Sequence, residues 1–191
     1  MIELLQGSMD ADVPWFPCWG ISFDKANSST SEIVEKFLEI RPNSRWVLIS
    51  INSAASERHL WSAWYTMEQL FFQKSALSKN PDAEFIRIIS GTHQLKTAFS
   101  RAGLNKNDSE AWLAFLPESN GDLNELAEVS SIEFTENAQK IIYILNAKII
   151  TKRPEPSKDG LERLGINFEG DSKLINDDIF IGHLARSSIS S

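Results

Sequence analysis

The sequence has little cysteine, no long apolar run and no excess of positive charge, and each absence excludes a class of protein. The one cysteine, Cys18, cannot form an internal disulfide and fits a reducing compartment. No apolar run approaches the roughly 20 residues that a membrane-spanning helix requires. The 19 Lys and Arg residues stand against 26 Asp and Glu, and the net charge of −7 argues against a general nucleic-acid coat protein.

Targeting signals and catalytic motifs are equally scarce. The first ten residues lack the basic flank and the apolar core of a signal peptide, so we expect a cytoplasmic protein without membrane association. The sequence contains no GxSxG, HExxH, GxxxxGK[ST] or GxGxxG pattern, and Cys18 has no CxxC partner. The three histidines, His59, His93 and His183, fall on separate predicted helices, which disfavours a zinc site. We therefore expect no catalytic residues, no metal and no cofactor.

An ordinary apolar content of 42% is arranged in short segments typical of an α/β protein. Alternation over 15–23 and the apolar run over 46–51 predict two strands. A capping box of Ser29 and Glu32 predicts the start of a helix. Strands and helices then alternate without a clear boundary, so we expect one domain over 1–191, with a small mixed sheet, flanking helices and a helical C-terminal part.

A long helix is predicted over 57–77, with Ser56 as its N-cap. Its main apolar stripe consists of Leu60, Ala63, Trp64, Met67, Leu70 and Phe71. A second stripe consists of Trp61, Tyr65 and Phe72. A helix with two apolar faces is either central in the core or covered by another chain, and we favour the core.

Further helices are expected toward the C-terminus. Thr135 is a candidate N-cap for a helix over 136–145, and a single helical turn is expected within 160–170. The last helix should begin after Asn176, and residues 187–191 are expected to form a frayed tail.

The segment PDAEFIRIISGTHQLKTAFSRAG, residues 81–103, is the stretch around which we expect the chain to be organised. Its apolar run over 85–89 predicts a buried strand, which a turn at Ser90–Thr92 joins to a short helix. With a strand expected over 111–116, this predicts a strand–helix–strand unit. Free amides at such a helix N-terminus suit a phosphate or carboxylate, so an anionic-metabolite site at Ser90–Thr92 is an alternative function, although the single glycine favours a plain turn.

Four basic residues are the candidate contacts for RNA. Arg58 and His59 begin the long helix, and Lys96 and Arg101 lie on the side of the short helix expected to be exposed. If the two helices are neighbours, these residues form a local basic strip on an acidic protein. Taken singly, each is a solvated surface residue.

Three segments of the chain have the order and spacing of motifs in a known family. They are SERHLWSAW, PDAEFIRIISGTHQLKTAFSRAG and DDIFIGHLARSSI. The residues that match are His59, Leu60 and Ala63; Glu84, Ser90, Gly91, Gln94, Leu95, Ala98 and Gly103; and Ile179, Leu184 and Ala185. Together they resemble the PRPK-binding protein family, the small regulatory subunit of the KEOPS/EKC complex. Gly182 and His183 depart from the family pattern, which tends to carry a glutamate there.

The resemblance implies a non-catalytic subunit that docks on the kinase-like ATPase of the complex and supports formation of threonylcarbamoyl-adenosine in tRNA. Archaeal members of the family are also implied to hold the tRNA 3′ CCA end. We expect the apolar stripe of the last helix to be exposed and to fit a groove of the kinase. This stripe consists of Ile179, Phe180, His183 and Leu184. The basic strip is the candidate site for the CCA end, since a few cations with aromatic stacking suffice for single-stranded RNA.

Overall fold

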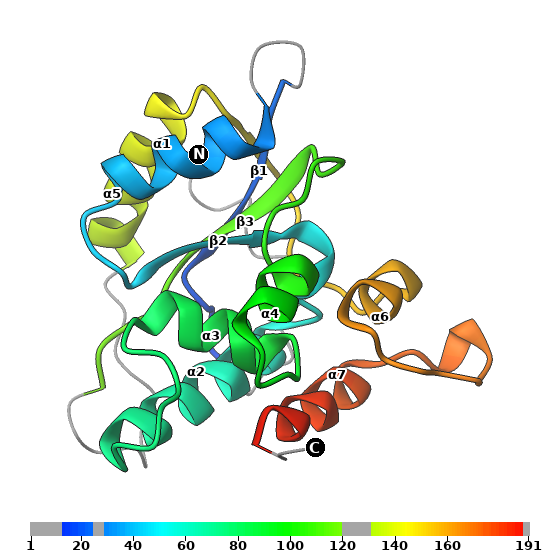
Figure 1. The fold of residues 1–191 in the computed structure, drawn as a ribbon. Coiled ribbons are helices and arrows are strands. Elements are labelled where there is room, and N and C mark those ends of the chain that lie inside the picture. Colours follow the sequence, from blue (N-terminus) through cyan, green and yellow to red (C-terminus); the bar gives the residue numbers. More distant parts are fainter. Residues whose placement is uncertain (1–12, 25–28, 120–130, 189–191) are drawn as a thin grey trace.

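A four-stranded antiparallel sheet lies between two layers of helices in the computed structural model, which describes residues 13–24, 29–119 and 131–188 (Figure 1). The strands are β1 (Cys18–Ser22), β2 (Trp46–Ser50), β3 (Glu110–Phe115) and β4 (Lys148–Ile150). Their order is β2-β3-β1-β4, and each neighbouring pair is antiparallel. The predicted α/β class, the small sheet and the helical C-terminal part are confirmed, but the sheet is antiparallel rather than mixed.

Helices make up most of the rest of the described chain. They are α1 (Thr30–Ile40), α2 (Glu57–Phe72), α3 (Pro81–Ile89), α4 (Leu95–Ala102), α5 (Ser131–Ile144), α6 (Lys158–Leu164) and α7 (Asp177–Leu184). Short 3₁₀ helices are η2 (Ile51–Ser53), η3 (Ser172–Leu174) and η4 (Ala185–Ser188). α1 and α5 cover one face of the sheet, and α2, α3, α4, α6 and α7 form the layer on the other face (Figure 1).

The strands are apolar on both faces because helices cover both faces. In β2, Trp46 and Leu48 pack in the cluster with α1 and α5, whereas Val47 and Ile49 pack in the cluster on the other side. Successive side chains of a strand point to opposite faces, so a strand buried on both sides reads as a continuous apolar run. This is why the sequence predicted the strand at 46–51 within one residue.

The layer of α1 and α5 follows the sequence pattern closely. The Ser29 hydroxyl accepts a hydrogen bond from the Glu32 amide at 3.3 Å, and the Glu32 carboxylate accepts one from the Ser29 amide at 2.7 Å, which confirms the predicted capping box. The expectation that Thr135 caps α5 is wrong, because the helix begins at Ser131. Phe134 stacks on Phe115 with ring centroids 4.2 Å apart, so apolar packing continues into the turn before Thr135.

α2 is central in the other layer, as the sequence predicted. Ser56 accepts a hydrogen bond from the His59 amide at 3.0 Å and is the expected N-cap. The main stripe is buried from Leu60 to Met67, which confirms the core interpretation. The second stripe is divided, because Trp61 is buried while Tyr65 is 37% and Phe72 is 72% exposed.

The predicted strand–helix–strand unit over 81–103 is wrong, because residues 81–89 form helix α3. Pro81 is the first residue of the helix, Asp82 and Glu84 lie in its first turn, and Arg87 lies in its last turn. These features favour a helix, and they outweigh an apolar run too short to separate strand from helix. The segment is therefore a helix–turn–helix that precedes β3.

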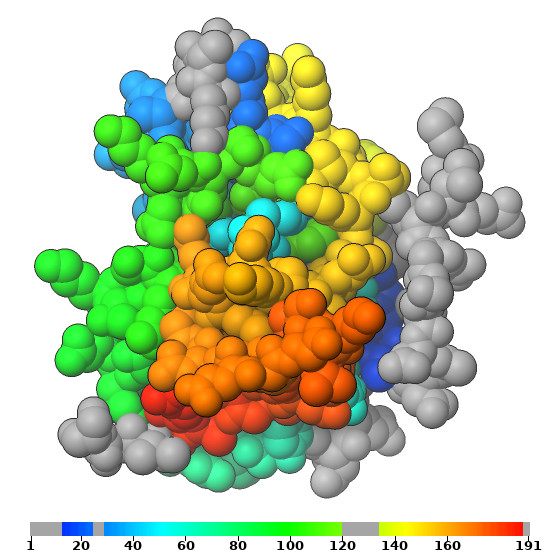
Figure 2. Space-filling view, turned by 90° about the vertical axis from the view of Figure 1, so that its right-hand side faces the viewer, coloured from blue at the N-terminus to red at the C-terminus, as the bar shows by residue number. Residues whose placement is uncertain are grey.

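The C-terminal part wraps across the face of this layer. In Figure 2 the segment after α6, drawn in orange, lies above the red of α7, which in turn lies above the teal of α2. The prediction of a frayed tail over 187–191 is wrong for its first residues, because Ser187 is buried and belongs to η4. Residues 189–191 lie outside the described part of the chain.

Candidate functional site

The apolar stripe of α7 faces the interior of the protein, not solvent. Phe180 is 1% exposed, His183 and Leu184 are each 4% exposed, and Ile179 is half-buried. The Phe180 ring lies against His59 of α2, with centroids 5.7 Å apart. The expectation that this stripe is exposed for a partner is wrong, because the same residues complete the chain's own core.

The N-terminus of α7 is held by charged groups of α2. The Asp177 carboxylate accepts a hydrogen bond from Ser56 Oγ at 2.8 Å and two from the Arg58 guanidinium at 2.8 and 3.0 Å. Arg58 also donates to Asp178 at 2.5 Å. The Arg58 guanidinium lowers the pKa of Asp177, and the Asp177 carboxylate in turn raises the pKa of Arg58. Asp177 is therefore anionic at neutral pH and anchors the helix.

His59 is completely buried beside this anchor. Its Nδ1 accepts a hydrogen bond from the Ala55 amide at 3.2 Å, so Nδ1 carries no proton. Its Nε2 is buried and has no hydrogen-bond partner among the described residues. Burial, together with a smaller contribution from the neighbouring His183, lowers the pKa of His59 to about 3, although Asp177 opposes the change. His59 is consequently a neutral core residue and not the RNA contact that the sequence predicted.

His183 fills the turn between α3 and α4. Its Nε2 lies 3.0 Å from the Ser90 carbonyl oxygen, so Nε2 carries the proton that is donated. Gly91 adopts a φ of +59°, and a Cβ at this position would overlap the His183 ring. Glycine is therefore required twice, for its backbone conformation and for the close approach of His183. The Ser90–Thr92 turn, which the sequence offered as an anionic-metabolite site, therefore packs against a side chain of its own chain.

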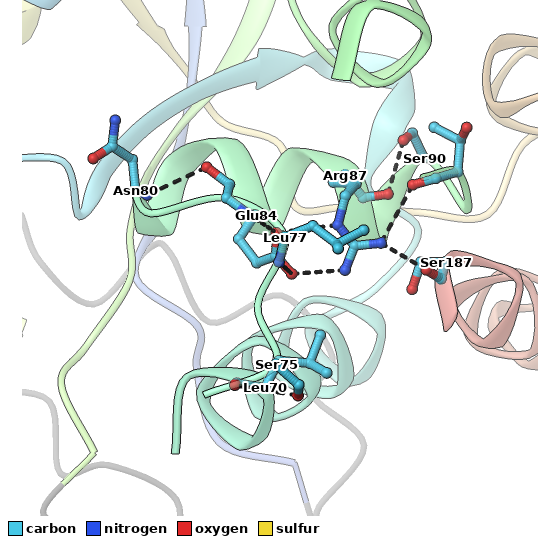
Figure 3. A network of polar contacts seen from close by, with 10 residues as sticks. Leu70, Ser75, Leu77, Asn80, Glu84, Arg87, Ser90 and Ser187 are labelled. Atoms are coloured by element: carbon cyan, nitrogen blue, oxygen red, sulfur yellow. Dashed lines mark hydrogen bonds and ion pairs between the residues drawn. The ribbon is translucent and has the colours of Figure 1, made fainter. Parts of the chain in front are cut away.

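A buried ion pair within α3 is hydrogen-bonded to η4, which follows α7 (Figure 3). The Arg87 guanidinium donates to both carboxylate oxygens of Glu84, at 2.6 and 3.1 Å. Arg87 also donates to the Ser187 carbonyl at 2.6 Å, and Glu84 accepts from the backbone amides of Leu77 and Ser78. Because both charged side chains are buried and hydrogen-bonded, the pair fixes where η4 lies against α3.

The four predicted RNA contacts do not form a basic strip. His59 is buried, and the charge of Arg58 is paired with Asp177 and Asp178. Arg101 donates to the Ser90 carbonyl at 3.3 Å, whereas the side chain of Lys96 is exposed. The prediction failed because a sequence shows where cations lie on a helix but not which of them are paired within the chain.

Arginine pairs elsewhere are also structural. Arg153 binds Glu57 and the backbone carbonyls of Phe16 and Cys18. Burial raises the pKa of the Cys18 thiol to about 12, although Arg153 opposes the change, so Cys18 is an inert core residue at neutral pH. Arg163 binds Asp108 at 2.6 Å and two carbonyls at the end of α4. These arginines tie loops to the sheet and the helices.

The outward side of α7 carries residues that the sequence reasoning missed. Ile181 is half-buried, and Gly182 and Ala185 are exposed. Apart from the two adjacent residues and the helix's own backbone, no described atom lies within 4 Å of the position that a Cβ of Gly182 would take, so no described side chain requires glycine there. The signal that could have found this face is the glycine itself, which costs a helix interior stability.

Metal and membrane elements are not found in the described part of the chain. No group of three or more His, Cys, Asp or Glu residues there could hold a metal ion. None of its helices combines the length and the apolar character needed to cross a membrane.

Comparison with known proteins gave no match, either to a family model or to a curated protein.

Proposed function

We propose that this chain is a cytoplasmic, non-catalytic interaction subunit that docks on the kinase-like ATPase of a KEOPS-type complex and supports threonylcarbamoyl-adenosine formation in tRNA. The observation that carries the proposal is that the three segments that resemble the PRPK-binding protein family lie together in the fold. They contain α2, the α3–α4 pair and α7, which pack against one another in one layer. Segments far apart in the sequence therefore meet, for instance where the His183 ring lies against Gly91.

The buried polar side chains support a role without catalysis. His59, Glu84, Arg87 and His183 are the residues that a buried active site would use, and each has a contact that holds one helix to another segment. An enzyme places such groups around a space for the substrate. Here the turn that could have bound a small anion contains the His183 ring instead.

The outward face of α7 is the docking surface in this proposal. It consists of Ile181, Gly182 and Ala185, and it replaces the buried stripe that the sequence suggested. Glycine in a helix interior is about 1 kcal/mol less favourable than alanine, and no described side chain lies close enough to Gly182 to explain the glycine. Small residues on an exposed helix let a partner backbone approach closely, which suits a groove on a second protein.

Co-purification with the cognate kinase-like ATPase tests the proposal. We expect a complex with the unmodified chain, and Ala185→Arg should weaken its affinity at least tenfold because the side chain would enter the contact. Ser100→Arg places the same side chain on the exposed surface of α4 and should leave the affinity unchanged. Absence of a complex, or equal affinities of both variants, would overturn the proposal or the assigned face, respectively.

The tRNA 3′ end is not part of this proposal. Of the four residues expected to bind it, His59 is buried and Arg58 is paired. Filter binding of tRNA with and without its CCA end would test the remaining implication of the resemblance. Retention that depends on CCA would show an RNA site elsewhere on the molecule.

A further inference from the structure

We propose that His59 and His183 form an acid-sensitive latch, which keeps α7 docked on α2 and the α3–α4 turn only while both imidazoles are neutral. The latch is a property of the folded chain and does not depend on the proposed partner. It rests on two buried rings from distant parts of the sequence, in each of which protonation would place an N–H where no described residue offers an acceptor.

In His183 the hydrogen bond determines the tautomer. Nε2 donates to the Ser90 carbonyl, so in the neutral ring Nδ1 is unprotonated. Nδ1 is buried without a hydrogen-bond partner in the described part of the structure. Protonation would place an N–H donor and a positive charge there with no acceptor, which is costly in a buried site.

In His59 the arrangement is reversed but the consequence is the same. Nδ1 accepts from the Ala55 amide, so Nε2 carries the proton of the neutral ring. Protonation would place an N–H at Nδ1, directly opposite the N–H of Ala55. The hydrogen bond would be lost, and a charged ring would lie against Phe180 of α7.

The charged groups around the two rings do not favour imidazolium. Burial opposes protonation of His183, and so do Arg186 after α7 and Arg101 of α4, whereas the hydrogen bond to the Ser90 carbonyl favours it. Asp177 favours protonation of His59, but its carboxylate is already bound by Arg58 and Ser56 of α2. Of the charged groups of α3, Glu84 and Arg87 neutralise each other and Asp82 is paired with Arg41, and Asp178 of α7 is bound to Arg58.

The direction of the pH effect follows from proton linkage. Burial lowers the pKa of both rings below the ordinary 6.5, so the docked state binds fewer protons than the open state. Docking is thus fully stable above about pH 6.5 and weakens as the pH falls. With a pKa of 6.5 when open and about 3 when docked, His59 raises the opening equilibrium about 30-fold at pH 5.

Acid should act on this layer selectively. Among the described residues, the buried ionisable side chains other than Cys18 lie on α2, α3 and α7, namely His59, Glu68, Glu84, Arg87 and His183. α7 has eight residues and follows the irregular segment 165–176, whose only regular element is η3. A short helix held by few contacts opens locally before a central sheet does.

Hydrogen exchange of the full chain, measured peptide by peptide by mass spectrometry at pH 7.5 and 5.0, tests the latch. After correction for the intrinsic pH dependence of exchange, we expect the opening equilibrium of 177–188 to rise at least 30-fold at pH 5, as the linkage of His59 requires. Peptides from β3 should keep their protection. Unchanged protection of α7, or simultaneous loss in β3, would overturn the proposal.

A double variant separates titration from packing. His59→Asn places an amide oxygen where Nδ1 accepts, and His183→Gln places an amide nitrogen where Nε2 donates, so both hydrogen bonds persist without a titratable group. This variant should lose the rise at pH 5, whereas His93→Gln should keep it. An equal rise in the double variant and the unmodified protein would exclude the two histidines.

A measurement on the unmodified protein covers the case in which the double variant does not fold. Imidazole NMR signals report the protonation of each ring directly. At pH 6.0 we expect His59 to remain neutral and His183 to be less protonated than a histidine with the ordinary pKa of 6.5. A ring that titrates near pH 6.5 while α7 stays protected would overturn the latch.

Discussion

The two helical layers of this protein are built from different chemistry. The cluster that joins α1 and α5 to the sheet consists of apolar side chains, with Ile33 and Phe37 from α1 and Ile141 from α5 among them. The layer on the opposite face has an apolar cluster too, but it also buries the Glu84–Arg87 ion pair and two histidines. The layer of α1 and α5 is held by buried apolar surface. The opposite layer is also held by buried hydrogen bonds and an ion pair, which form in one arrangement only.

The two layers should therefore differ in which substitutions they tolerate. Apolar packing tolerates changes of similar volume, because its energy depends mainly on area and fit. A buried ion pair adds little net stability but penalises every arrangement that breaks it. The position of α7 is therefore fixed by few contacts, and loss of any one of them should be felt locally. Substitutions in each layer test this difference.

The largest effect is expected from Arg87→Met in the polar layer. It leaves the buried Glu84 carboxylate without its counterion, which should lower the free energy of unfolding by about 3–5 kcal/mol. Urea denaturation at pH 7.5 measures the loss. Adding Glu84→Gln should recover much of it, because no buried charge then remains. A loss below about 1 kcal/mol in the single variant would show that the pair is not a specifying contact.

A substitution in the apolar layer should be nearly as costly but indifferent to pH. Ile141→Ala leaves a cavity between α5 and the sheet and should cost about 3 kcal/mol of unfolding free energy. The cost should be the same at pH 7.5 and 5.0, since the cluster contains no titratable side chain. Ile141→Val, as the milder control, should cost about 1 kcal/mol. A cost that changes with pH would contradict the separation of the two layers.

Gly91→Ala should have an intermediate effect that is concentrated at α7. The positive φ alone costs an L-residue about 1–2 kcal/mol, and the new methyl would push the His183 ring away from Ser90. Hydrogen exchange should therefore show lost protection over 177–188 and little change in β1. Equal losses in both segments would indicate general destabilisation instead.

The smallest effect, and the only gain, is expected from Gly182→Ala on the outward side of α7. Alanine is better than glycine in a helix interior by about 1 kcal/mol, and no described atom beyond the adjacent residues and the helix backbone lies within 4 Å of the added methyl. Exchange of the α7 amides should slow accordingly. If the proposed docking is correct, the same variant should also bind the kinase-like ATPase less well. A loss of stability would show that the glycine serves the fold.

Local patterns were sufficient for most of the secondary structure. The capping box at Ser29, the cap at Ser56 and the strand at 46–51 needed only neighbouring residues, and the structure confirms each of them. The run over 85–89 was misread because a short apolar segment has no period long enough to separate strand from helix. Pro81 and the charged residues around the run favour a helix, which is the structure that forms.

The candidate site was predictable in its members but not in its arrangement. The sequence placed an apolar stripe on α7, a glycine at position 91 and cations at the start of α2, and all of them occur where expected. Their roles depend on partners more than 80 residues away: His183 reaches Ser90, Asp177 reaches Arg58, and Ser187 reaches Arg87. Hydrophobic periodicity shows that a helix has an apolar side but not whether its own chain or another one covers it. That choice is made by long-range packing, because burial depends on which surfaces the completed fold brings together.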